Sequence, residues 1–106
     1  MAFNGTEGAP IPLATAGAYT ATYRATLPVG STATIGTFFG KDILNQLLAQ
    51  GGAMGIRFYF AIDGSGTQTL VAVAADAAEN DMVNGIVADV STPCPPFCST
   101  SNVLNS

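Results

Sequence analysis

Two runs of β-branched and aromatic residues flank a short glycine-rich segment in the middle of the chain. The first run covers residues 53–62, the second covers residues 67–75, and Asp63-Gly64-Ser65-Gly66 lies between them. Asp and Gly are the residues that tight turns between antiparallel strands require. The pattern therefore predicts a β-hairpin, which fixes the centre of the fold.

Both faces of this expected hairpin carry apolar side chains. In the first strand the even positions face one way, while Arg57 and Tyr59 face the other. A single layer of helices covers only one face of a sheet, so the second face indicates contact with a neighbouring subunit. We expect that contact to use Arg57, Tyr59, Val71 and Val73.

The best helical pattern covers residues 41–50, with an apolar stripe at helical spacing and Gly51-Gly52 as its stop. A weaker helix is expected over residues 17–26, with Thr15 as its N-cap. Residues 31–39 form a short strand or a loop, and residues 86–90 are a candidate third strand.

A chain of 106 residues is long enough for one domain. We expect an N-terminal arm over residues 1–14, a core over residues 15–90 and an irregular C-terminal arm over residues 91–106. The expected fold class is α+β, with two helices packed on a small antiparallel sheet centred on the hairpin and with extended terminal arms.

Charged residues are scarce: three basic and seven acidic side chains make up 9% of the chain. Ordinary globular domains carry roughly a quarter. With so little charge to keep copies apart, the chain is expected to be a structural self-assembling subunit of a homo-oligomer, with a filament or a tube among the open forms.

The same composition excludes other functions. The basic residues Arg24, Lys41 and Arg57 are single and scattered, whereas nucleic-acid binding needs clustered positive charge. Histidine, the commonest general base, is absent from the sequence. We therefore expect no nucleic-acid partner, no enzymatic activity and no cofactor.

No stretch of the sequence approaches the roughly 18 consecutive apolar residues of a membrane-spanning helix, so no transmembrane segment is expected. The first residues lack the basic and apolar regions of a secretory signal. These observations favour a cytoplasmic location, with leaderless export to the extracellular space as the alternative.

The segment Cys94-Pro-Pro-Phe-Cys98 is the one motif with chemical character. Its spacing differs from the redox-active Cys-x-x-Cys motif, and a zinc site needs four ligands. We therefore favour a structural turn, with Cys94 and Cys98 either buried or joined in a disulfide, and no metal. The alternative function is a small metal- or ligand-binding module that uses the Cys94/Cys98 turn.

The remaining acidic residues have simpler interpretations than metal binding or acid–base chemistry. Asp63 is expected in a hairpin turn rather than a calcium loop. The acidic side chains Asp76, Glu79, Asp81 and Asp89 are expected on a solvated loop and its neighbour, with Asp76 as the ion-pair partner of Arg57. The core is expected to hold the rings of Tyr19, Tyr23, Phe38, Phe39, Phe58, Tyr59 and Phe60.

Several short segments occur together in the second half of the chain: Gly55-Ile56-Arg57-x-Tyr59, the Asp63 turn, Asp76 and the tail from Pro93-Cys94-Pro95-Pro96-x-Cys98 to Asn102-Val103-Leu104-Asn105-Ser106. This combination resembles a set of small uncharacterised bacterial proteins with a P-C-P-P-x-C tail. The resemblance covers the C-terminal half and part of the preceding helix. It implies no activity and no site residues, because none is established for that set.

Overall fold

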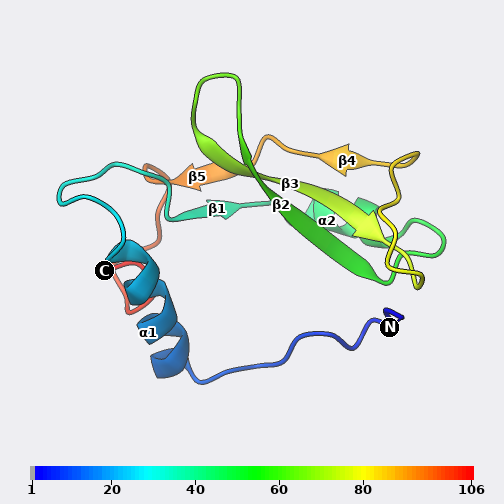
Figure 1. The fold of residues 1–106 in the computed structure, drawn as a ribbon, viewed down its shortest axis with the longest axis horizontal. Coiled ribbons are helices and arrows are strands. Elements are labelled where there is room, and N and C mark those ends of the chain that lie inside the picture. Colours follow the sequence, from blue (N-terminus) through cyan, green and yellow to red (C-terminus); the bar gives the residue numbers. More distant parts are fainter. Residues whose placement is uncertain (1) are drawn as a thin grey trace.

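The computed structural model describes residues 2–106 and has an α+β fold, as the sequence predicts (Figure 1). Its elements are α1 (Leu13–Arg24), β1 (Gly36–Phe38), α2 (Lys41–Leu48), β2 (Gly55–Ile62), β3 (Gln68–Ala75), β4 (Val87–Ala88) and β5 (Thr92–Cys94). Among these residues, no helix is long and apolar enough to cross a membrane.

The hairpin supplies two of the three strands of the larger sheet, which has the strand order β2-β3-β4 and is antiparallel. Strands β2 and β3 pair along their whole length, from Gly55 opposite Ala75 to Ile62 opposite Gln68. Asp63 closes the turn, because its Oδ1 accepts hydrogen bonds from the amides of Ser65 (2.9 Å) and Thr67 (3.0 Å). The predicted turn role of Asp63 is thus confirmed.

A second, two-stranded sheet joins β1 to β5. Gly36 pairs with Cys94 and Phe38 pairs with Thr92. The expectation that residues 91–106 are wholly irregular is therefore wrong at β5. Pro93 is compatible with this strand because a proline is tolerated where a strand lies at the edge of a sheet.

Three hydroxyl groups connect the two sheets. Ser91 Oγ accepts a hydrogen bond from Thr37 Oγ1 of β1 at 2.5 Å. The same oxygen lies 2.9 Å from Thr69 Oγ1 of β3. Because all three side chains are partly buried, this chain of hydroxyl contacts fixes how the sheets sit against each other.

Helix α2 covers one face of the larger sheet, and the core lies between them. The predicted helix over residues 41–50 is confirmed, although it ends at Leu48. Leu47 packs against Ala72 and Ala88. Partly buried side chains around this cluster are Phe39, Ile43, Ile56 and Ile86. Since most of the buried residues are alanines, the core is small.

Helix α1 lies at one end of the molecule beside the C-terminal tail (Figure 1). It begins at Leu13 after Pro12, so the expected Thr15 cap and an arm ending at residue 14 are wrong. The ring of Pro12 holds φ at −59°, within the range of a helix start. Arg24 donates to the carbonyl oxygens of Leu104 (2.5 Å) and Ser106 (2.7 Å), which ties the tail to this helix.

Candidate functional site

The four residues predicted for self-association lie on one face of the hairpin. Arg57 stands opposite Val73, and Tyr59 stands opposite Val71. Their exposure differs: Tyr59 is 47% exposed, whereas Val73 is only 3% exposed. Val73 is therefore covered by its own chain and is not part of an accessible surface.

Arg57, Tyr59 and Asp81 form a hydrogen-bonded cluster on this face. Arg57 Nη1 donates to Asp81 Oδ1, and Tyr59 Oη donates to Asp81 Oδ2. The hydrogen bond from Tyr59, together with that from Arg57, lowers the pKa of Asp81 below its ordinary value. Hydrogen bonding to the same carboxylate raises the pKa of Tyr59. Asp81 thus stays ionised between two donors.

The expected ion pair between Arg57 and Asp76 is wrong. Asp76 Oδ1 instead accepts the amides of Ala78 (2.9 Å) and Asn80 (3.0 Å) in its own loop. That loop turns the chain back so that Asp81 forms a bridge with Ala75, the last residue of β3. Asp81 is in this way brought to Arg57, and the loop is less solvated than the sequence indicates.

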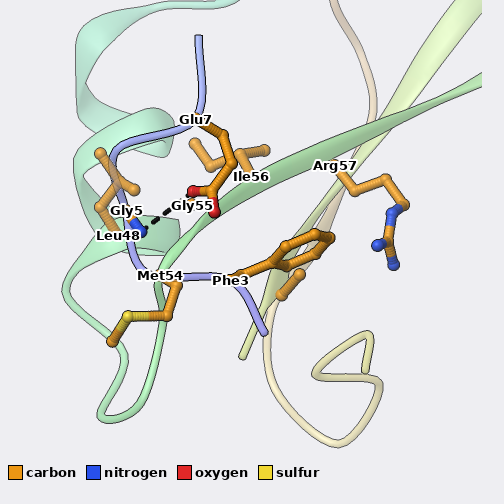
Figure 2. Close-up of a pocket in the computed structure, with 9 residues that line it drawn as sticks. Phe3, Gly5, Glu7, Leu48, Met54, Gly55, Ile56 and Arg57 are labelled. Carbon is orange, nitrogen blue, oxygen red and sulfur yellow. Dashed lines mark hydrogen bonds between the residues drawn. The ribbon is translucent and has the colours of Figure 1, made fainter. Parts of the chain in front are cut away.

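Phe3 of the N-terminal arm covers the same face near the start of β2 (Figure 2). The guanidinium carbon of Arg57 lies 5.3 Å from the centre of the Phe3 ring, a cation–π contact. Between arm and body is an open pocket of about 420 Å³. Its lining includes Glu7, Leu48, Met54, Gly55 and Ile56. This role of Phe3 has no signal in the sequence beyond an aromatic side chain in a glycine- and proline-rich arm.

The opposite face of the hairpin is covered only near its base. Phe58 contacts Phe39 with ring centres 5.6 Å apart, but Phe60 is 86% exposed and Ile62 is 74% exposed. The turn of the hairpin stands clear of the other elements in Figure 1.

The expectation that the aromatic rings fill the core is wrong for most of them. Those with large exposed fractions are Tyr19, Tyr23, Phe38, Phe58, Tyr59 and Phe60. The reason is physical, because one short helix and a sheet of small residues enclose too little volume for seven rings.

Cys94 and Cys98 are joined by a disulfide with their Cα atoms 4.7 Å apart. Both sulfur atoms are thereby used, and a metal would require them as free thiolates. Among residues 2–106, no three His, Cys, Asp or Glu side chains lie close enough together to hold a metal ion. The geometry thus gives no support to the metal-binding alternative, which remains a prediction.

No protein-family model, curated protein or solved structure matches this chain. The resemblance of its tail to small bacterial proteins stays a prediction for the same reason.

Proposed function

We propose that this chain is a structural, non-enzymatic subunit that assembles with copies of itself. The main support for this proposal is the large surface area of the folded chain. The folded chain exposes 7199 Å², whereas a compact monomer of its 10.7 kDa exposes about 5,500 Å². The excess of about 1,700 Å² is roughly twice what one partner buries in an ordinary protein interface.

The shape of the molecule agrees with its area. The radius of gyration is 15.5 Å, against about 13 Å for a compact domain of this length. An extended arm and a separate helix account for the difference (Figure 1). Such parts bury little surface within one subunit, and a neighbouring copy supports their burial.

The chemistry of the exposed surface also favours association. Large apolar side chains that are more than half exposed include Tyr19, Val29, Phe38, Phe60, Ile62, Val83, Val90 and Phe97. A sequence with 9% charged residues supplies few ionised groups between them. Apolar surface of this kind is stabilised when a partner removes it from water.

Light scattering coupled to gel filtration tests the proposal at micromolar concentrations. We expect a mass that is a multiple of 10.7 kDa, and negative-stain microscopy then distinguishes a closed ring from a filament or a tube. A thermal midpoint that rises with protein concentration is the second expected result, because association stabilises only the folded state. A monomer throughout that range contradicts the proposal.

The Cys94–Cys98 disulfide favours extracellular location over the cytoplasm, because disulfides persist in oxidising compartments. Mass spectrometry of the protein from its native cells, alkylated before lysis, tests this point. Unmodified cysteines joined in a disulfide are expected, and two alkylated thiols indicate a cytoplasmic protein instead.

A further inference from the structure

Strand β2 is an edge of the larger sheet, and the N-terminal arm covers only its start. It is the outer strand in the order β2-β3-β4, and it is eight residues long. Natural edge strands are usually blunted by lysine, proline, bulges or a covering segment. The sequence of β2, Gly-Ile-Arg-Phe-Tyr-Phe-Ala-Ile, contains no lysine or proline, and its one charge, Arg57, is paired with Asp81.

The direction of the β2 amides follows from the ladder. The amide of Asp63 donates to Thr67 O at 2.9 Å. Asp63 and Thr67 follow the pair Ile62–Gln68 in the same register, so they form a hydrogen-bonded pair and Ile62–Gln68 is a non-hydrogen-bonded pair. Hydrogen-bonded and non-hydrogen-bonded pairs alternate in an antiparallel ladder. The amides and carbonyls of Phe58, Phe60 and Ile62 therefore point away from β3, toward the open edge.

The partner that fits the open edge of β2 is a second copy of this chain. Along β2 itself, Tyr59 is 47%, Phe60 86% and Ile62 74% exposed, which supplies apolar surface for an interface between copies. The opposite edge of the sheet, β4, is only two residues long. The amide of Ile86 beside it is already bonded to Gln50 Oε1 at 2.9 Å. Among the edge strands of residues 2–106, only β2 is eight residues long, so a second β2 is the edge of matching length.

We propose that the β2 strands of two copies pair antiparallel across a two-fold axis beside Tyr59. This inference rests on the proposed self-association and names its surface. The arm crosses the start of β2, where Gly5 lies against Met54 (Figure 2), and the turn begins at Asp63. Residues 58–62 lie beyond the arm, and pairing centred on Tyr59 joins the outward backbone groups of Phe58 to those of Phe60 in the second copy.

The same register keeps like charges apart and brings apolar side chains into contact. It places Arg57 opposite Ala61 of the second copy, so that two guanidinium groups do not face each other. It places Phe60 opposite Phe58 of the second copy on the other face, which brings exposed rings together. The two sheets then form one continuous sheet of six strands.

A proline substitution tests the backbone pairing. Phe60→Pro removes the outward amide while sparing the ladder to β3, and Phe60→Ala is the matched control that removes the side chain alone. We expect the dissociation constant of the Pro variant to exceed that of the Ala variant at least tenfold, with unchanged far-ultraviolet circular dichroism. Equal association of the two folded variants overturns the inference.

Cross-linking tests the register without disturbing the backbone. Two copies of a Tyr59→Cys variant place the new thiols directly opposite each other. Diamide, which removes one hydrogen from each thiol, should then form a disulfide-linked dimer. Val83→Cys, on an exposed loop, is the control and should stay unlinked. If the protein is oligomeric but Tyr59→Cys forms no more linked dimer than this control, the edge pairing is contradicted and the proposed function is not. If the wild type is monomeric, the proposed function is contradicted as well.

Discussion

Gly17 of α1 lies so close to Val103 of the C-terminal tail that a Cβ atom at position 17 would crowd it. A Cβ atom at position 17 would stand 3.0 Å from the Val103 carbonyl oxygen and 3.1 Å from its Cβ. Gly17 is also the buried residue of the helix. This close approach, with the two hydrogen bonds from Arg24, is what attaches α1 to the tail.

Gly17→Ala should displace the tail on α1. Alanine is a better helix former than glycine by about 1 kcal/mol, so the helix itself is stabilised, while Val103 must move by a few tenths of an ångström to accept the new methyl group. Limited proteolysis should cut the tail faster in this variant than in wild type. Ala21→Gly, at an exposed position of the same helix, is the control and should leave the tail protected. A tail that stays protected in Gly17→Ala contradicts the packing described.

Tyr59→Phe should raise the pKa of Asp81 toward its ordinary value of 3.8. The variant removes the hydrogen bond that contributes most to the lowered value. An NMR titration of the Asp81 carboxyl carbon measures the shift. Tyr19→Phe, on α1 and away from this cluster, should leave the titration unchanged. No change of the Asp81 pKa in Tyr59→Phe means that the hydrogen bond is absent in solution.

The same cluster gives the chain a pH window of stability. Because folding lowers the pKa of Asp81, its stabilising contribution is complete above about pH 4 and is lost as the pH falls through the still lower folded value. Because folding raises the pKa of Tyr59 above 10.0, its contribution is complete below that pH and is lost as the pH rises through the folded value. Denaturant unfolding should show both losses in wild type and weaker ones in Asp81→Asn. Identical profiles for the two proteins contradict this assignment.

The elements that the sequence predicts well are those set by neighbouring residues. The apolar stripe of α2 and the alternation around the Asp63 turn are local patterns, and both elements form within two residues of their expected bounds. Helix α1 begins two residues before the expected Thr15 cap, because Pro12, with φ fixed at −59°, is the residue that precedes the first helical turn.

The features that the sequence does not reveal depend on residues far apart. Strand β5 forms only because β1, more than fifty residues earlier, lies beside it. Asp81 rather than Asp76 meets Arg57 because the loop between them uses the Asp76 carboxylate for its own amides. Burial of Val73 depends on the same folding-back of the chain. Periodicity carries no information on any of these contacts.

Replacing both Cys94 and Cys98 by serine should destabilise the β1–β5 sheet. In the chain-entropy model, closing a five-residue loop contributes about 2 kcal/mol. Urea unfolding measures this loss. A reducing agent should reproduce it in wild type and should have no effect on the double serine variant, which makes that variant its own control. Equal stability of wild type with and without reductant contradicts a structural role for the bridge.

Ser91→Ala should loosen the joint between the two sheets. The hydroxyl of Ser91 contacts Thr37 on β1 and Thr69 on β3, and both partners are partly buried. Loss of one such hydrogen bond costs about 1 kcal/mol, and an unsatisfied buried hydroxyl adds to that cost. We therefore expect a loss of roughly 1–3 kcal/mol in unfolding free energy, with faster hydrogen exchange in β1. Ser101→Ala, at an exposed bend, should change neither quantity. If the two variants are equally stable, the sheets are held together by packing rather than by these hydroxyl groups.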